Sequence, residues 1–281
     1  MHEMTLEQQV PAGNESIDDG FLEDMDSALA GWPDAADRLH DALRKDEFQL
    51  YSQPILSLKS TRRYEMAEVL IRLREEEALL LPPGDFLPVF EHYGMMPELD
   101  RWVVRHAAQH LARGHAIPAF CINISGQTLG DLDFADDVAS ALKAAGVPPA
   151  SLIFEVDESD VINRPGAAES FASAIKAIGC RMSLDGFARR SVSFAPLKAL
   201  RLDFVKVDGS IVRNILHSEV AMSKLGAVVR VGEVIGVGVI AECVEAQNIL
   251  ARLRGARVGY AQGFGISQPQ AIDATPQIRM L

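Results

Sequence analysis

Residues 152–187, LIFEVDESDVINRPGAAESFASAIKAIGCRMSLDGF, decide the fold because they contain a complete strand–helix–strand unit. The two ends of the stretch, residues 152–158 and 181–187, are short and mainly apolar, as buried strands are. Between them, residues 167–179 repeat apolar side chains at helical spacing. Two strands joined by one helix over about 30 residues indicate a βαβ unit with parallel strands.

The same alternation continues along most of the chain. Predicted strands cover residues 48–55, 64–72, 119–125, 152–158, 181–187, 204–209, 238–244 and 257–264. Predicted helices begin near residue 36 and then cover residues 84–94, 98–114, 133–146, 167–179, 194–201, 218–235 and 246–255. About eight strands in about 230 residues favour an α/β fold of the TIM-like (β/α)8 barrel type. An open, doubly wound sheet stays open as the alternative at this point.

Charge divides the chain into a tail and a body. The first 37 residues hold ten of the 39 acidic residues and none of the 27 basic ones, so the rest carries 29 acidic and 27 basic residues. We expect a flexible acidic tail at 1–36, a single domain at 37–271 and a short tail at 272–281. A nearly neutral body argues against general nucleic-acid binding.

Targeting signals and cysteine spacing point to an ordinary cytoplasmic protein. The chain shows neither a secretory signal nor an apolar run of the roughly 18–20 residues that a membrane span needs. Its three cysteines are far apart and odd in number, so they fit neither a disulfide framework nor a zinc site. We therefore expect a cytoplasmic chain with reduced thiols and no membrane partner.

Polar residues interrupt seven of the predicted strands, mostly toward their C-terminal halves. They are Glu68, Asn123, Glu155, Asp185, Lys206, Glu242 and Gln262. One such residue could be a satisfied core residue, but seven unpaired buried groups would be costly, so they must share partners. A barrel brings its strand ends together at one face, where barrel active sites lie.

The residue types in this set indicate a chemistry. Glutamate, asparagine and aspartate offer oxygen ligands, which suit Mg²⁺ or Mn²⁺ rather than zinc. A lysine beside them suits a phosphate or an anionic transition state. Together they point to metal-assisted hydrolysis of a phosphodiester.

These residues lie in motifs that resemble the EAL domain family, bacterial phosphodiesterases that open cyclic di-GMP to the linear dinucleotide pGpG. The resemblance covers about residues 38–270. It is carried, in order, by EFQLYSQPI, EVLIR, NIS, EVDE, KVD, AECVE and QGF. It implies a variant barrel whose first strand runs antiparallel to its neighbours.

The resemblance also implies roles for individual residues. A first Mg²⁺ or Mn²⁺ would be held by Glu68, Asn123, Glu155 and Asp185. Catalytic roles would fall to Lys206, which would position water and stabilise charge, and to Glu242, which would help hold a second metal or act as base. The ligand would be contacted by Leu70, Arg72 and Gln262, with Arg72 on a phosphate, and Glu158 would brace the loop after residues 181–187.

One motif departs from the family pattern. The family usually reads Asp-Asp-Phe-Gly-Thr-Gly-Tyr-Ser-Ser where this chain reads DGFARRSVS, residues 185–193. Gly186 therefore stands in the position of a principal ligand of the second metal, and it has no side chain to bind one. Ala188 and Arg190 replace two loop glycines, so we expect a different backbone path there. Cys243 replaces a third family glycine.

Three functions are weighed on this basis. The first is a receptor that binds cyclic di-GMP with weak or absent hydrolysis, because the first metal set is kept and the second is damaged. The second is an active metal-dependent phosphodiesterase that compensates for Gly186. The third is a protein-interaction module without nucleotide. A protein partner and a homodimer stay open under all three.

Overall fold

The computed structural model describes residues 34–59, 64–74, 80–189 and 193–274 of the 281-residue chain. Nearly all of the predicted acidic tail, the end of the predicted C-terminal tail and Arg190 therefore lie outside the described residues. Within these ranges, no helix combines the length and the hydropathy that crossing a membrane requires.

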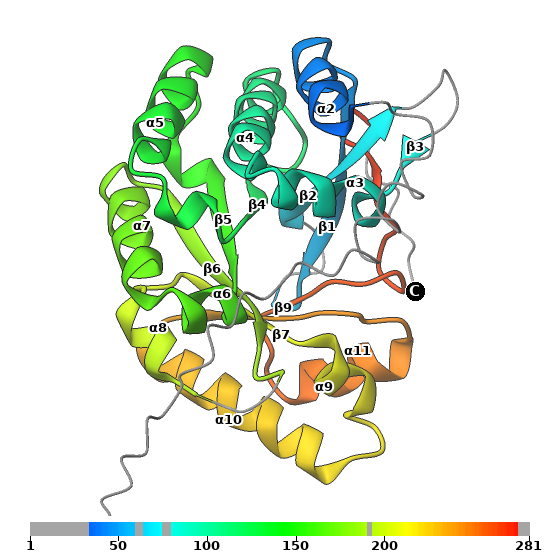
Figure 1. Cartoon of the computed structure of the whole chain (residues 1–281). Coiled ribbons are helices and arrows are strands. Elements are labelled where there is room, and N and C mark those ends of the chain that lie inside the picture. Colours follow the sequence, from blue (N-terminus) through cyan, green and yellow to red (C-terminus); the bar gives the residue numbers. More distant parts are fainter. Residues whose placement is uncertain (1–33, 60–63, 75–79, 190–192, 275–281) are drawn as a thin grey trace, which may run out of the picture.

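The chain alternates strands and helices, with the strands at the centre and the helices outside (Figure 1). The strands are β1 Phe48–Ser57, β2 Tyr64–Arg74, β3 Leu80–Leu81, β4 Phe120–Ile124, β5 Leu152–Asp157, β6 Arg181–Phe187, β7 Phe204–Val207, β8 Gly238–Ala241, β9 Tyr260–Ala261 and β10 Gln270–Ala271. The α-helices are α2 Ala35–Arg44, α3 Pro83–His92, α4 Met96–Ala112, α5 Phe134–Ala145, α6 Glu158–Asn163, α7 Pro165–Ala177, α8 Ala195–Ala199, α9 Gly209–Asn214, α10 Glu219–Ile235 and α11 Gln247–Gly255.

The sheet closes into an eight-stranded barrel in the order β1-β9-β8-β7-β6-β5-β4-β2. Strand β1 closes it, because it pairs with both β2 and β9 and is antiparallel to both. From β2 through β9 the neighbouring barrel strands are parallel. The predicted barrel with an antiparallel first strand is thereby confirmed, and the open sheet is excluded.

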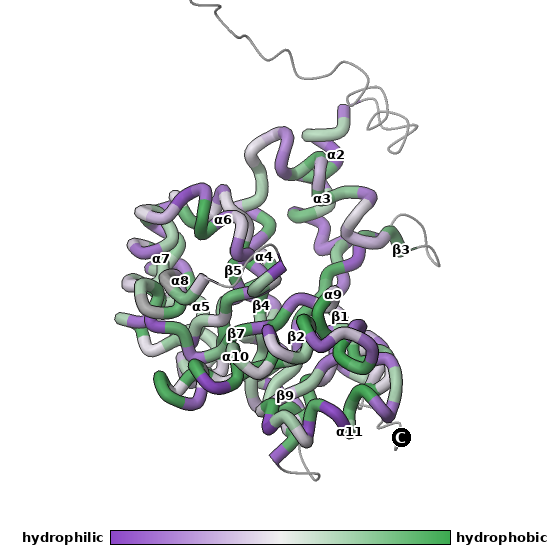
Figure 2. Tube along the Cα trace, turned by 90° about the horizontal axis from the view of Figure 1, so that it is seen from below, coloured by the Kyte–Doolittle hydropathy of each residue, from purple (hydrophilic) through white to green (hydrophobic). Residues whose placement is uncertain are grey.

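Local sequence explains where the longer helices begin and end. Ser218 caps α10 by accepting a hydrogen bond from the backbone N–H of Ala221, and Gly236 ends the helix with φ +77°. Along α11 apolar and polar residues alternate with the helical turn, as the green and purple segments of Figure 2 show. The apolar faces pack on the barrel, where they bury Ile249, Leu250 and Leu253 of α11.

The core has two layers, because strand side chains alternate between the inside and the outside of the barrel. Outward side chains form a large apolar cluster with the helices. Inward side chains at the N-terminal ends of the parallel strands, together with Ile55 of the antiparallel β1, form a smaller apolar floor. Its other members are Met66, Ala119, Cys121, Ile153, Phe204 and Ile240. The next inward position, two residues further along five of these strands, holds Glu68, Asn123, Glu155, Lys206 and Glu242. The apolar floor therefore supports a polar layer directly above it.

The strand predictions that exceed the observed strands most are those at 238–244 and 257–264. The strand predicted at 238–244 ends at Ala241, and the one predicted at 257–264 shortens to Tyr260–Ala261. Cys243 has φ +54°, a left-handed conformation that ends the extended backbone. Glu242 and Gln262 thus lie just beyond their strands rather than within them.

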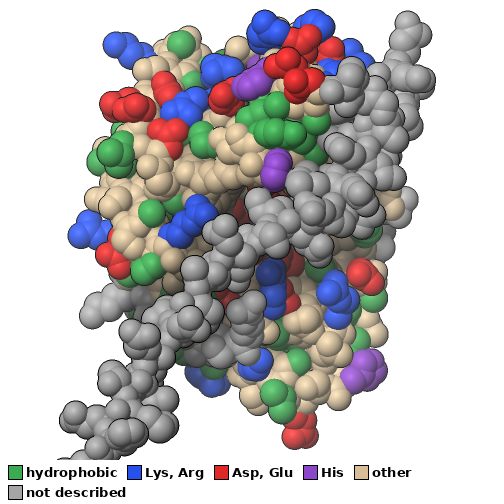
Figure 3. Space-filling view, in the orientation of Figure 1, with side chains coloured by type: hydrophobic (Ala, Val, Ile, Leu, Met, Phe, Trp, Pro, Cys, Tyr) green, Lys and Arg blue, Asp and Glu red, His purple; other side chains and the backbone are tan. Residues whose placement is uncertain are grey.

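The surface over α2, α4 and α5 carries both signs of charge. Lysine and arginine side chains alternate there with aspartate and glutamate at the top of the view in Figure 3. Arg101 of α4, for example, is paired with Asp131 at 2.8 Å. Such a mixed surface is typical of a face that is simply solvated.

Candidate functional site

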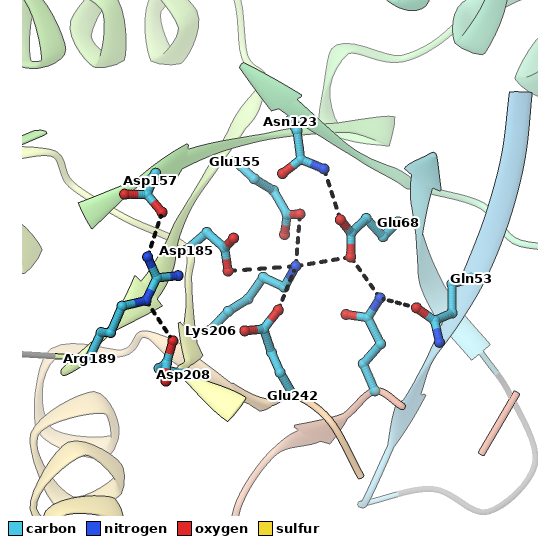
Figure 4. Close-up of polar contacts among 11 residues, drawn as sticks. Gln53, Glu68, Asn123, Glu155, Asp157, Asp185, Arg189, Lys206, Asp208 and Glu242 are labelled. Carbon is cyan, nitrogen blue, oxygen red and sulfur yellow. Dashed lines mark hydrogen bonds and ion pairs between the residues drawn. The ribbon is translucent and has the colours of Figure 1, made fainter. Parts of the chain in front are cut away.

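The Lys206 ammonium group is the centre of the polar layer (Figure 4). The lysine extends from β7 and is 1% exposed. Its Nζ lies 3.0 Å from Glu68 Oε2, 3.1 Å from Glu155 Oε2, 3.0 Å from Glu242 Oε1 and 3.8 Å from Asp185 Oδ1. Side chains from β2, β5, β6, β7 and the end of β8 therefore meet at one point.

Amide side chains complete this network. Asn123 Nδ2 donates to Glu68 Oε1 at 2.8 Å, and Gln262 Nε2 donates to Glu68 Oε2 at 2.7 Å. Gln262 also donates to Gln53 Oε1 at 3.0 Å, and Gln53 in turn donates to the Ser267 carbonyl at 2.9 Å. Glu68 thus receives hydrogen bonds on both carboxylate oxygens.

Burial and charge shift the pKa values of these groups in opposite directions. Burial raises the pKa of Glu155 to about 8, although Lys206 opposes the shift. Burial would also raise the pKa of Glu68, but Lys206 and the amide donors outweigh it, so this pKa is lowered. Burial would lower the pKa of Lys206, yet Glu155, Glu68, Glu242 and Asp185 hold it well above its usual value. The carboxylates therefore favour the charged form of the lysine.

Several acceptors in the layer have no hydrogen-bond partner. Glu155 Oε1, Asp185 Oδ1 and Gln262 Oε1 are buried without one. Buried acceptors of this kind are costly unless something else satisfies them. Oxygen atoms from carboxylates and amides suit a hard divalent cation, so the donor set fits Mg²⁺ or Mn²⁺.

The spacing around Lys206 is nevertheless that of an ion pair cluster. Within the described ranges, no three Asp, Glu, His or Cys side chains are spaced as the ligands of one ion. The ammonium group of Lys206 lies among the carboxylates instead. A divalent cation at the Glu68, Asn123, Glu155 and Asp185 side chains would have to displace some of these lysine contacts.

The position beside residue 186, where the family resemblance would place a second metal, does not fit a metal ion. Gly186, at φ +65°, lies on a β-bulge of β6 between Leu184 and Phe187 and supplies no ligand. The guanidinium group of Arg189 lies beside it, with Nε 2.8 Å from Asp208 Oδ2 and Nη1 3.7 Å from Asp157 Oδ2 (Figure 4). A cation of the protein itself occupies this side of the polar layer.

The loop after β6 keeps a glycine-like conformation at one of the replaced positions. Ala188 has φ +66°, the left-handed region that a glycine favours. Its N–H donates to Glu158 Oε1 at 3.4 Å, so Glu158 contacts the start of this loop. Burial raises the pKa of Glu158.

Leu70 and Arg72 lie outside the cluster around Lys206. They follow Glu68 on the same face of β2, because inward positions repeat every two residues. Arg72 Nη1 donates to the Ile71 carbonyl at 2.7 Å, and its Cζ lies 5.5 Å from the centre of the Tyr51 ring. Leu70 lines a cavity of about 350 Å³ between β2, α3, α4 and the end of β4.

This cavity also contains a buried carboxylate that the sequence analysis did not single out. Asp100 is 4% exposed and accepts hydrogen bonds at Oδ2 from Thr128 Oγ1 at 2.6 Å and from the Ser125 N–H at 3.1 Å. Burial raises its pKa to about 6. The only sequence signal was one acidic residue on the otherwise apolar face of the 98–114 helix.

Asp157 and Asp208 were also missed. Each lies two residues after a predicted site residue, Asp157 after Glu155 and Asp208 after Lys206. The strand period of two residues could have found both.

Comparison with known proteins agrees with the resemblance seen in the motifs. The family model described as EAL domain matches residues 36–269. The chain is 30% identical over 241 residues to the cyclic di-GMP phosphodiesterase PdeF of Escherichia coli, a match that covers 85% of this chain and 32% of that protein. The chain spans about a third of the length of the curated relatives it matches.

Two solved structures show the same fold. The FimX EAL domain from Pseudomonas aeruginosa bound to cyclic di-GMP has a TM-score of 0.77 at 28% identity, covering 86% of this chain and 99% of that one. The PaMucR phosphodiesterase in complex with cyclic di-GMP has a TM-score of 0.76 at 26% identity, covering 84% and 97%. Together with the family match over most of the chain and the polar layer in the barrel, these similarities show that the chain belongs to the EAL domain family.

Proposed function

We propose that this barrel binds cyclic di-GMP through one divalent cation and hydrolyses it weakly or not at all. The observation that carries the proposal is the asymmetry of the polar layer. On one side the oxygen donors expected for a first metal are all present. On the other side Gly186 supplies no ligand and an arginine lies in its place.

The first metal would be held by Glu68, Asn123, Glu155 and Asp185. When bound, Mg²⁺ or Mn²⁺ supplies positive charge to a phosphate and polarises its oxygen atoms. Lys206 adds a fixed positive charge at the same place, because its ammonium group lies within 3.1 Å of Glu68, Glu155 and Glu242. Together the ion and the lysine offset the negative charge of the surrounding carboxylates, so that a phosphodiester anion can approach them.

The remaining contacts would orient the nucleotide. Arg72 can reach a phosphate from the far end of β2, where its guanidinium group is only partly buried. The cavity beside Leu70 has apolar walls for a base, and Asp100 Oδ2 already holds two hydrogen bonds, which leaves Oδ1 as an acceptor. A guanine base presents N–H donors on its Watson–Crick edge, and this oxygen can accept from them.

Hydrolysis needs an activated water as well as a bound phosphodiester. In a two-metal site the second ion activates that water and the pair of ions clamps the phosphate. Without a ligand at residue 186, the remaining candidate for a base is Glu242, whose pKa burial raises to about 7. Loss of one preorganised catalytic group commonly lowers rates by orders of magnitude.

An active phosphodiesterase is the second candidate. It is favoured by the intact arrangement of Lys206 and Glu242 beside the first metal set. In that case Glu242 would remove a proton from water while Lys206 stabilises the charge that develops on the phosphate.

Measurement of binding and of product separates the two candidates. The purified chain is titrated with cyclic di-GMP by calorimetry in Mn²⁺, and pGpG is followed by chromatography in Mg²⁺ and in Mn²⁺. We expect saturable binding with little or no pGpG. Turnover equal to that of PdeF would establish the phosphodiesterase instead, and absence of binding in either metal would overturn both candidates.

A further inference from the structure

The guanidinium group of Arg189 fills the space into which a side chain at residue 186 would project. A Cβ atom built on Gly186 would lie 2.8 Å from Arg189 Nη2 and 3.1 Å from its Cζ. The same Cβ would lie 3.3 Å from Asp157 Oδ2. The guanidinium group would therefore have to shift if an aspartate stood at residue 186.

Arg189 is held there by two carboxylates on either side of β6. Asp208, at the end of β7, accepts from Arg189 Nε at 2.8 Å, and its other oxygen caps α9 through the Ser210 N–H at 2.9 Å. Asp157, the last residue of β5, is the register partner of Asp185 and lies 3.7 Å from Arg189 Nη1. Both acceptors are placed by regular structure, Asp208 as an N-cap and Asp157 in the sheet.

The arrangement has the charge pattern of a cation site that the protein fills itself. Asp157 and Asp208 lie at the ends of the strands on either side of β6, and the positive charge between them belongs to Arg189, whereas Asp185 on β6 faces Lys206 at 3.8 Å. In the family pattern residue 189 is a threonine and residue 186 an aspartate. This chain has lost an acid and gained a base at two positions that touch.

We propose that Arg189 replaces the second metal ion, so that this barrel binds one divalent cation and excludes the other. The inference rests on the proposed function, because it concerns the same site. Gly186 and Arg189 act as a pair: the glycine makes room for the guanidinium group, and the guanidinium group neutralises Asp157 and Asp208. An aspartate returned to residue 186 alone would pair with Arg189 and would not recruit a metal.

The test counts Mn²⁺ ions by electron paramagnetic resonance of free Mn²⁺, with no nucleotide present. We expect one ion per chain for the wild type and for Gly186→Asp. We expect two ions for the double variant Gly186→Asp, Arg189→Thr, which restores both family residues. Circular dichroism confirms that each variant is folded.

A second variant leaves Gly186 unchanged, because any residue other than glycine would be strained at its φ of +65°. Arg189→Glu replaces the cation by a carboxylate between Asp157 and Asp208, and we expect it to bind two ions. Arg257→Glu is the matched control, because Arg257 is an exposed arginine paired with Glu233 at 3.4 Å. It should bind one ion.

The outcomes distinguish this inference from the proposed function. Two ions in the wild type or in Gly186→Asp alone would overturn the replacement by Arg189. One ion in both the double variant and Arg189→Glu would overturn it as well. No ion in the wild type would instead contradict the first metal site of the proposed function. One ion gained in the double variant over such a wild type would still support the pairing of Gly186 with Arg189.

Discussion

Lys206 is the residue on which the electrostatic balance of the polar layer depends. Its side chain is 1% exposed, and Glu155 beside it is 0% exposed. Removal of one partner from a buried pair leaves an uncompensated charge, which typically costs about 3–5 kcal/mol. The lysine therefore stabilises the fold whatever its part in chemistry.

Lys206→Met should lower the free energy of unfolding by roughly that amount in chelator, and excess Mn²⁺ should restore part of it by neutralising the same carboxylates. Urea denaturation with and without Mn²⁺ measures both effects. Lys176→Met is the control, because Lys176 is paired with Asp203, at a distance of 2.7 Å, and this pair lies outside the polar layer. A loss that Mn²⁺ does not reduce would argue against a metal site among these carboxylates.

Asp100 should show a trade between stability and binding. Its pKa is about 6 in the folded chain against an ordinary value of 3.8, so the folded state holds the proton more tightly than the unfolded state. Stability contributed by this group is thus greatest at low pH and falls as the pH rises from about 4 to about 6. At pH 8 the ionised carboxylate costs the fold on the order of 1–3 kcal/mol.

Asp100→Asn should therefore be more stable than the wild type at pH 8, with the difference closing toward pH 4. It should also lose affinity for cyclic di-GMP, since an amide accepts less strongly than a carboxylate from guanine N–H groups. Denaturation at several pH values and calorimetry check the two effects. If the difference in stability between Asp100→Asn and the wild type were the same at pH 4 and at pH 8, burial of Asp100 would not be costly for its ionised form.

Arg72→Ala should weaken binding of cyclic di-GMP by about 1.5–3 kcal/mol, as expected for a lost charge-assisted hydrogen bond to phosphate. Arg113→Ala, at the exposed end of α4, is the matched control and should bind as the wild type does. Calorimetry in Mn²⁺ measures the affinity. Unchanged affinity in Arg72→Ala would place the phosphate elsewhere.

At the scale of elements, two loops hold each other in place beyond β8 and β9. Val244 N–H donates to the Gln262 carbonyl, and Gly265 N–H donates to the Val244 carbonyl, each at 2.9 Å. A Cβ on Gly263 would lie 2.2 Å from Val244 N, so only glycine allows this approach. The interlocked backbones position Glu242 and Gln262 after their short strands have ended.

Gly263→Ala should separate these loops and lower the free energy of unfolding by about 1–3 kcal/mol. Binding of cyclic di-GMP should fall with it, because Gln262 and Glu242 lose their positions. Gly255→Ala is the control: no atom lies within 4 Å of its added Cβ, and it ends helix α11. Thermal denaturation should find that variant unchanged or slightly stabilised, and an equal loss in both variants would contradict the argument.

The sequence predicted the elements well and their last residues less well. The runs at 152–158 and 181–187 could be recognised because apolar strands have a clear local pattern. The end of β8 at Ala241 could not, because it depends on the left-handed conformation of Cys243 and on backbone pairing with residue 262. Patterns within a strand carry no information on a partner that lies elsewhere in the chain.

For the site, the sequence predicted which strand residues come together but not the contacts made by the loop after β6. Inward polar residues such as Glu68 and Glu155 stand out against apolar neighbours, so the sequence predicted that they meet. The contact of Arg189 with Asp208 depends on how the loop after β6 folds back, and no local pattern encodes it. The antiparallel direction of β1 came from the family resemblance and not from residue spacing.

For the whole molecule, the site belongs to no single part of the fold. Side chains around Lys206 come from β2, β4, β5, β6 and β7 and from residues just after β8 and β9. A ligand that binds them bridges most of the barrel. Binding should therefore stabilise the barrel as a unit rather than one loop.

Cyclic di-GMP at about 100 times its dissociation constant should stabilise the folded chain by ~2.7 kcal/mol and raise a single melting transition. Hydrogen exchange should slow in strands from β2 to β8 together. Protection limited to residues 181–189 would indicate that the nucleotide touches only the loop after β6.

The position of β1 has a consequence for synthesis on the ribosome. Gln53 of β1 donates to the Ser267 carbonyl, a contact between residues 214 positions apart. At ~5–20 residues per second, a ribosome needs roughly 10–40 s to produce the second partner after the first. During that interval the edge of β1 that pairs with β9 has no partner from its own chain, and an exposed strand edge is prone to aggregation. Slow translation should therefore increase aggregation of this chain, and a chaperone that covers strand edges should reduce it.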